Sequence, residues 1–185
     1  MTSSADVPIF FVGCRGSGKS TVASRLATRL GRSFVDADLE LESAAGPSIR
    51  ALFETEGEQS FRDREEKLLA DLCRRAGTVV ATGGGCVLRE GNRRLLRSTG
   101  TVIWLTAEPA TLWQRIQLDP GSAERRPPLT DGGPGEVEKT LRERQALYRE
   151  VAHLVIATEG REIDDIVQEI VTRLALPRET LCKPC

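Results

Sequence analysis

Residues Gly13–Ser20 constrain the fold of this chain more than any other part of its sequence. They read Gly-Cys-Arg-Gly-Ser-Gly-Lys-Ser and match GxxxxGKS/T, the pattern of a phosphate-binding loop (P-loop). The apolar run Val7–Val12 before the loop predicts a buried strand, and the amphipathic residues 19–30 after it predict a helix. Strand, loop and helix in this order are the context in which the pattern binds a nucleoside triphosphate.

Each residue type in the loop has a physical role in phosphate binding. The glycines let backbone N–H groups converge on phosphate oxygens, and the start of the following helix adds partial positive charge. We expect Lys19 to reach the β- and γ-phosphates and Ser20 to offer its hydroxyl to Mg²⁺. The predicted nucleotide-binding residues of the loop are Gly16, Ser17, Gly18, Lys19, Ser20 and Thr21.

Apolar, β-rich runs alternate with helix-period segments along the rest of the chain. The five predicted strands are Val7–Val12, Ser33–Val35, Thr78–Ala81, Thr101–Leu105 and His153–Ala157, and the predicted helices cover residues 19–30, 39–45, 48–75, 90–97, 108–117, 136–150 and 162–175. This alternation predicts an α/β fold with three α/β/α layers around a five-stranded parallel sheet. A length of 185 residues predicts a single domain over residues 1–185.

Two segments do not fit the alternation. Residues 118–135 are rich in proline, glycine and charge and lie between two predicted helices, so we interpret them as a mobile lid. Residues 177–185 predict a flexible tail. Cys182 and Cys185 in this tail have the spacing of half a zinc site or of a redox pair, but no second pair follows, and we expect them to be inert.

Charge and cysteine content limit the partners of the chain. Its 26 basic and 27 acidic residues give a net charge of −1, so no strong field attracts nucleic acid or a membrane surface, and small-molecule partners are expected. The first residues lack the features of a signal peptide, and the five cysteines are an odd number, which argues against a disulfide framework. We expect a cytoplasmic monomer.

Two carboxylates follow the second predicted strand. Asp36 and Asp38 lie at the carboxyl end of this strand, where ligands bind in open α/β sheets, and in an extended chain they point the same way. One carboxylate could reach Mg²⁺ while the other orients or deprotonates an attacking hydroxyl. Asp38 could instead cap the following helix, and the two roles are compatible.

Two further features indicate an acceptor site. Arg62 and Glu65 are three residues apart in a predicted helix and share one face, so the glutamate can orient the arginine to bind a carboxylate. Gly83, Gly84 and Gly85 end the third predicted strand and allow close approach to its backbone. Because no apolar strand ends in the aspartate that usually accompanies magnesium, Asp36 is the better candidate for that role.

Taken together, the motifs resemble those of the shikimate kinase family, whose members are P-loop kinases with a fold like that of nucleoside-monophosphate kinases. The resemblance covers nearly the whole chain. In order, the matching motifs are GxxGxGKST at Gly13–Thr21, FxDxD at Phe34–Asp38, GExxFRxxE at Gly57–Glu65, the triple glycine at Gly83–Gly85, RPxL at Arg126–Leu129 and ERxxLYxxVA at Glu143–Ala152. The resemblance implies ATP-dependent phosphorylation of the 3-hydroxyl of shikimate, on the route to chorismate and the aromatic amino acids, with Mg²⁺ as cofactor.

The resemblance also implies roles for individual residues. The acceptor would lie among Asp38, Arg62, Gly83, Gly84, Gly85 and Arg144, with the two arginines pairing its carboxylate and Asp38 contacting its hydroxyls. Arg126 on the lid would approach the transferring phosphoryl group, Arg115 would cover the adenine, and Ser20 and Asp36 would bind magnesium. Lys19, Asp38 and Arg126 are the implied catalytic residues. The lid departs from many relatives at Pro128.

Some alternatives remain at the level of single residues and of function. Arg144 lies four residues before Tyr148 in a predicted helix and could be an ordinary stacked surface residue, and His153 is expected to be structural. A kinase for gluconate or a nucleoside monophosphate would share the loop and the sheet. A nucleotide-dependent switch or an inactive relative that serves as a binding module would share the loop.

Overall fold

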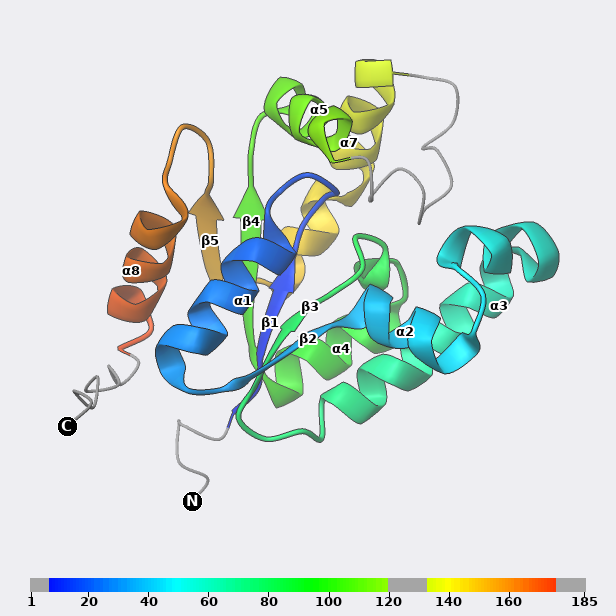
Figure 1. Cartoon of the computed structure of the whole chain (residues 1–185), viewed down its shortest axis with the longest axis horizontal. Helices are drawn as coiled ribbons and strands as arrows, with labels where there is room; N and C mark the ends of the chain where they lie inside the picture. Colours follow the sequence, from blue (N-terminus) through cyan, green and yellow to red (C-terminus); the bar gives the residue numbers. More distant parts are fainter. Residues whose placement is uncertain (1–6, 120–132, 176–185) are drawn as a thin grey trace.

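The computed structural model describes residues 7–119 and 133–175. Its five strands form one parallel sheet in the order β2-β3-β1-β4-β5, which confirms the predicted architecture (Figure 1). The strands are β1 Ile9–Val12, β2 Ser33–Asp36, β3 Thr78–Ala81, β4 Thr101–Thr106 and β5 Leu154–Ala157. Because β1 lies at the centre of the sheet, the loop that follows it opens at the middle of the sheet's carboxyl edge.

The predicted helices are all present within the described residues, with ends displaced by a few positions. They are α1 Lys19–Leu30, α2 Ala37–Ala45, α3 Ile49–Leu72, α4 Glu90–Thr99, α5 Pro109–Leu118, α7 Gly133–Val151 and α8 Ile163–Arg173. A short 3-10 helix, η1 (Cys86–Leu88), was not predicted and follows the triple glycine. None of the helices in residues 7–119 and 133–175 is long and apolar enough to cross a bilayer.

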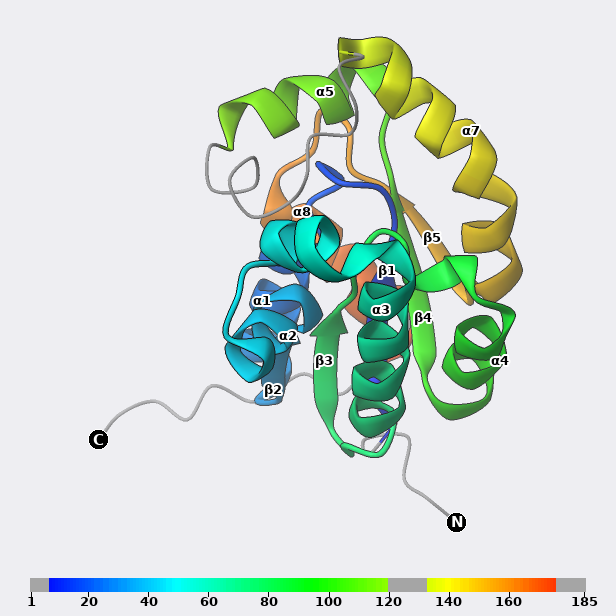
Figure 2. The same ribbon diagram turned by 90° about the vertical axis from the view of Figure 1, so that its right-hand side faces the viewer.

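The core lies on both faces of the sheet, because consecutive strand residues point to opposite sides. In β1, Ile9 and Phe11 pack against α1 and α8, whereas Phe10 and Val12 pack against α3, α4, α5 and α7. Figure 2 shows α4 and α7 on one side of the sheet and α1 on the other. All four β1 residues are buried, which explains the uninterrupted apolar run in the sequence.

Helix α3 differs from its prediction as one continuous helix over residues 48–75. It is interrupted at Gly57, whose φ of 81° and ψ of 169° are not helical. The residues before Gly57 cross over the rest of α3 (Figure 2), and the rings of Phe53 and Phe61 meet with centroids 4.6 Å apart. The interruption thus brings the first part of α3 over the carboxyl end of the sheet.

The predicted lid and tail lie mainly in undescribed parts of the chain. Residues 120–132, with Arg126 and Pro128, and residues 176–185, with Cys182 and Cys185, are outside the described residues. At the two borders of the predicted lid, Leu118 belongs to α5 and residues 133–135 belong to α7. The lid over residues 118–135 therefore stays a prediction, with α5 and α7 extending into its two ends.

Candidate active site

Two cavities lie side by side at the carboxyl end of the sheet. The larger, of about 710 Å³, is lined by the P-loop, and we call it the nucleotide cavity. The smaller, of about 180 Å³, is lined by residues of α3, the triple glycine and α7, and we call it the acceptor cavity. Arg15, Asp38 and Ile49 line both cavities. A group bound in one cavity therefore lies next to a group bound in the other.

The P-loop residues predicted to bind the nucleotide, Gly16–Thr21, all line the nucleotide cavity. Gly16 has a φ of 81°, and a Cβ atom there would lie 2.6 Å from the carbonyl oxygen of Leu112, so the loop requires glycine at this position. Lys19 is buried, and its Nζ donates to the carbonyl oxygens of Gly13 and Cys14 at 2.9 Å each. These bonds hold the ammonium group at the base of the loop.

Asp36 connects the P-loop to helix α2. Its Oδ2 accepts a hydrogen bond from the Ser20 hydroxyl at 2.5 Å. Its Oδ1 accepts from the backbone N–H groups of Asp38 at 3.1 Å and Leu39 at 3.4 Å, so Asp36 caps α2. The capping role considered for Asp38 therefore belongs to Asp36, because the helix begins two residues earlier than predicted, and the side chain of Asp38 faces the cavities instead.

The oxygens of Ser20 and Asp36 fit a magnesium ion held together with a nucleotide. Both residues line the nucleotide cavity, and a hydroxyl and a carboxylate are hard oxygen ligands of the kind that Mg²⁺ prefers. Within the described residues there is no group of three or more His, Cys, Asp or Glu side chains able to hold a metal ion. The donor set suits a cation that takes its other ligands from phosphates and water.

Arg115 lies at the far end of the nucleotide cavity. It donates to the carbonyl oxygen of Gly16 at 3.4 Å and to both the hydroxyl and the carbonyl oxygen of Thr158 at 2.9 Å. Asp119, Thr158, Arg161 and Ile163 also line this end. Sequence reasoning missed these four residues, since they come from the end of α5 and from the segment after β5, which carries no motif.

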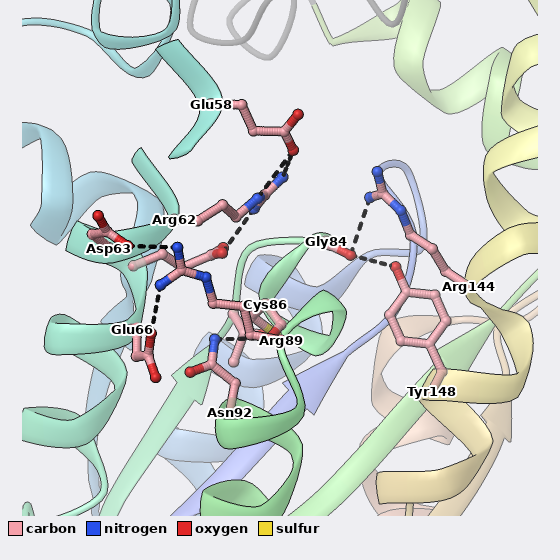
Figure 3. A network of polar contacts seen from close by, with 12 residues as sticks. Glu58, Arg62, Asp63, Glu66, Gly84, Cys86, Arg89, Asn92, Arg144 and Tyr148 are labelled. Carbon is pink, nitrogen blue, oxygen red and sulfur yellow. Dashed lines mark hydrogen bonds and ion pairs between the residues drawn. The ribbon is translucent and has the colours of Figure 1, made fainter. Parts of the chain in front are cut away.

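Arg62 is held in the acceptor cavity by two glutamates. Its Nη1 donates to Glu65 Oε2 at 2.7 Å and its Nη2 to Glu58 Oε1 at 3.2 Å, as Figure 3 shows for Glu58. The guanidinium lies 5.1 Å from the ring centroid of Phe61 and 5.9 Å from that of Phe53. The predicted pairing of Arg62 with Glu65 is confirmed, whereas Glu58 and the two rings were not predicted.

The electrostatic environment of Glu65 contains two opposed effects. Burial raises the pKa of its carboxyl, while the positive charge of Arg62 and its hydrogen bond lower it. The net direction is a raised pKa, because removal from water dominates.

The triple glycine makes room for the charged side chains around it. A Cβ atom on Gly83 would lie 2.7 Å from a carboxylate oxygen of Glu65 and 2.9 Å from one of Asp38. A Cβ atom on Gly85 would lie 2.4–2.6 Å from the guanidinium atoms of Arg62. The expected close approach to the glycines is confirmed, and the approaching groups are side chains of the acceptor cavity.

Gly84 presents its carbonyl oxygen to two side chains of α7. Arg144 Nη1 donates to it at 3.2 Å and the Tyr148 hydroxyl at 2.6 Å (Figure 3). Tyr148 is fully buried, and its hydroxyl also accepts from the Cys14 thiol at 3.8 Å. Burial raises the pKa of Tyr148 well above its usual value, so the phenol stays protonated and donates. Arg144 is thus a residue of the cavity rather than a stacked surface residue.

Comparison with known proteins agrees with this geometry. A family model described as shikimate kinase matches residues 15–175. A shikimate kinase from Burkholderia thailandensis is 42% identical over 171 residues, which are 92% of this chain and 91% of that protein. The structure of a shikimate kinase from Acinetobacter baumannii in complex with shikimate is 38% identical, with a TM-score of 0.87 over 93% of this chain and 94% of its own. A gluconokinase from Sinorhizobium meliloti, 18% identical with a TM-score of 0.60 over 92% of this chain and 93% of its own, shares the fold alone.

Proposed function

This chain belongs to the shikimate kinase family, and we propose that it transfers the γ-phosphoryl group of ATP to the 3-hydroxyl of shikimate in its two adjoining cavities. One observation carries the proposal. Arg62 and Arg144 line the acceptor cavity together with Arg15 and the carboxylate of Asp38, and this cavity adjoins the P-loop cavity. This set of charges suits an acceptor that has one carboxylate and several hydroxyls.

Arg62 and Arg144 are proposed to bind the carboxylate of shikimate. Each guanidinium already has a partner that sets its orientation, Glu65 and Glu58 for Arg62 and the Gly84 carbonyl for Arg144. An arginine whose orientation is set in advance loses less side-chain entropy when it binds a carboxylate. Gly83, Gly84 and Gly85 would complete this wall of the acceptor site, because their backbone has no Cβ atoms in the way.

Asp38 is proposed to act on the hydroxyl that attacks the γ-phosphate. Because it lines both cavities, its carboxylate can accept a hydrogen bond from the acceptor hydroxyl, orient it and take its proton. Lys19 would move from the loop carbonyls to the β- and γ-phosphates, and Arg126 is predicted to approach the transferring group.

Ser20 and Asp36 are proposed to hold Mg²⁺, the expected cofactor. When bound, the ion neutralises charge on the phosphate oxygens during transfer. Arg115 is proposed to cover the adenine in the nucleotide cavity, since its three hydrogen bonds hold the guanidinium between Gly16 of the P-loop and Thr158 after β5.

The test of this function is ADP release from ATP and Mg²⁺ in a coupled assay. Shikimate, gluconate, quinate and AMP are each offered as acceptor at the same concentration. We expect turnover with shikimate and far less with gluconate or AMP. Activity with gluconate or AMP but not with shikimate would contradict the proposed acceptor, and binding of ATP without turnover of any acceptor would favour a switch or a binding module.

Arg62→Lys tests the acceptor site directly. A lysine keeps the charge but cannot form the two parallel hydrogen bonds of a guanidinium, so the KM for shikimate is expected to rise about tenfold or more. The KM for ATP is expected to stay within about twofold, since Arg62 does not line the nucleotide cavity. An unchanged KM for shikimate would remove Arg62 from the site.

We further propose that the chain is one domain over residues 1–185 and acts as a cytoplasmic monomer. The P-loop, Asp38, Arg62 and Arg144 of one chain line two adjoining cavities. Cys14, Cys73 and Cys86 are free thiols, as is usual in a reducing compartment. Light scattering after size exclusion should give the monomer mass, and specific activity should not change with protein concentration.

A further inference from the structure

Arg89 joins helix α3 to the segment that follows the triple glycine, and it lines neither the nucleotide cavity nor the acceptor cavity. Its Nη2 pairs with Asp63 Oδ1 and its Nη1 with Glu66 Oε2, each at 2.5 Å (Figure 3). Asp63 and Glu66 are one helical turn apart on α3, and Arg62 lies on the same helix next to Asp63. The two ion pairs therefore act on the helix that carries an arginine of the acceptor site.

The chain between Gly83 and Arg89 is held by hydrogen bonds along its length. The backbone N–H groups of Cys86 and Leu88 donate to Gly83 and Gly85 at 3.2 and 3.0 Å. The buried side chain of Asn92 donates to the Cys86 carbonyl at 2.9 Å, as Figure 3 shows. Because this short segment is held at each turn, a shift of Arg89 would be transmitted to Gly85.

The acceptor site has little tolerance for a shift between α3 and the glycines. The guanidinium of Arg62 lies within 2.6 Å of the position that a Cβ atom on Gly85 would take. On its other side, Arg62 is bound to Glu65 and Glu58 on its own helix. The distance of α3 from the triple glycine thus sets where Arg62 stands relative to Gly84 and Arg144.

We propose that Arg89 is a positioning residue for the acceptor site, which it serves by fixing α3 against the triple-glycine segment through Asp63 and Glu66. The inference rests on the proposed function, because it concerns the site that binds shikimate. It adds a residue that touches neither substrate and lies in none of the motifs of the chain.

The setting of Arg89 differs from that of an ordinary surface ion pair. Its side chain is only 22% exposed, whereas the paired carboxylates of Asp63 and Glu66 are 54% and 45% exposed. Glu66 also approaches the first turn of α4, since a Cβ atom on Gly91 would lie 3.1 Å from its Oε1. A carboxylate at this end of a helix is stabilised by the backbone N–H groups there. Arg89 thus binds two carboxylates, one of which also lies close to the first turn of α4.

The test is the kinetics of Arg89→Gln in the full chain. The KM for shikimate is expected to rise about fivefold, because Arg62 and Arg144 are no longer held at the spacing of one carboxylate. The kcat and the KM for ATP are expected to stay within about twofold, since the P-loop and Asp38 are untouched. Arg89→Lys should give a smaller rise, because an ammonium group can reach only one of the two carboxylates well.

Two further variants complete the test: a control arginine on α4 and a double variant that removes the partners of Arg89. Arg94 lies on α4, five residues after Arg89, and pairs with Glu90, but its side chain is 74% exposed, so Arg94→Gln should leave both KM values unchanged. The double variant Asp63→Asn with Glu66→Gln removes the partners of Arg89 and should reproduce its effect. Adding Arg89→Gln to that double variant should cause no further rise in the KM for shikimate. If Arg89→Gln does not fold, the KM of the double variant for shikimate tests the inference alone.

The outcomes separate this inference from the proposed function. If the unmodified protein phosphorylates shikimate and the Arg89 and double variants keep its KM, the positioning role is wrong while the function stands. A lower kcat together with equally raised KM values for shikimate and ATP would make Arg89 a general structural residue. That result would also contradict the inference. If the unmodified protein does not act on shikimate, the proposed function itself fails.

Discussion

At the scale of single residues, the charged groups of the two cavities are held by other protein groups. Arg62 has two glutamate partners, Arg144 has the Gly84 carbonyl, and Asp36 binds both Ser20 and the first turn of α2. Such contacts fix positions before a substrate arrives, which reduces the entropy lost on binding. They also make the site sensitive to the ionisation and size of individual residues.

Glu65 gives a prediction for the pH dependence of stability. Burial raises its pKa above the ordinary value of 4.5, so the folded protein binds this proton more tightly than the unfolded chain does. Its contribution to the free energy of unfolding is fully present below pH 4.5 and is lost as the pH rises through the raised pKa. Relative to Glu65→Gln, the unmodified protein should therefore lose stability as the pH rises above 4.5 and through the raised pKa of Glu65.

Urea unfolding of both proteins at a series of pH values measures this difference. The glutamine side chain has the same size but does not titrate, so the variant is the reference against which the effect of Glu65 ionisation is measured. An increase in relative stability with pH would mean that the ion pair with Arg62 outweighs the burial of Glu65.

Gly85 gives a prediction about the steric effect of a side chain at this position on Arg62. In Gly85→Ala the new methyl group would meet the guanidinium of Arg62 at 2.4–2.6 Å, and Arg62 must move away from the site. The KM for shikimate is expected to rise about tenfold or more, with the KM for ATP nearly unchanged. Gly84→Ala is the comparison, because its nearest contact would be 3.4 Å from the Gly13 carbonyl, and its effect should be smaller. Equal effects of the two variants would contradict this explanation.

At the scale of secondary structure, the interruption of α3 matters most for the site. It brings Ile49 and Phe53 of the first part to the acceptor cavity, which the second part lines with Arg62 and Glu65. Apolar periodicity did not reveal the break, because residues with helical spacing continue on both sides of Gly57. The glycine was visible in the sequence, but only its backbone angles show that it ends one helix and starts another.

Gly57→Ala is expected to destabilise the protein by about 1–3 kcal/mol, since a φ of 81° with a ψ of 169° is strained for any residue with a Cβ atom. No atom lies within 4 Å of that Cβ position, so the cost comes from the backbone alone. The KM for shikimate should rise as well. Chemical unfolding measures the first effect, and Gly135→Ala is the control, because it lies in α7 with open space and no left-handed φ. Equal stability of Gly57→Ala and the unmodified protein would contradict the expected strain.

At the scale of the whole molecule, two cavities share one carboxylate between them. Asp38→Asn is expected to abolish turnover while leaving ATP binding intact, because the hydrogen bonds that hold Lys19 in the P-loop go to the carbonyl oxygens of Gly13 and Cys14. ATP with Mg²⁺ at 100 times its Kd should stabilise both the variant and the unmodified protein by about 2.7 kcal/mol. Thermal unfolding with and without ATP measures this, and loss of the stabilisation in the variant would show that Asp38 acts on the nucleotide.

The sequence by itself determined the parallel sheet, the P-loop and most of the residues now found around the two cavities. It could do so because these features depend on short-range rules: alternation of apolar residues, glycines at a tight turn, and side chains one helical turn apart, as in Arg62 and Glu65. Only the tertiary structure decided which aspartate caps α2, that Tyr148 binds Gly84, and that Arg89 joins Asp63 and Glu66. The cap is a local contact, but it depends on where α2 begins. The contacts of Tyr148 and Arg89 join residues that are far apart along the chain, so no local spacing reveals them; they arise when α3, α4 and α7 pack on the same face of the sheet.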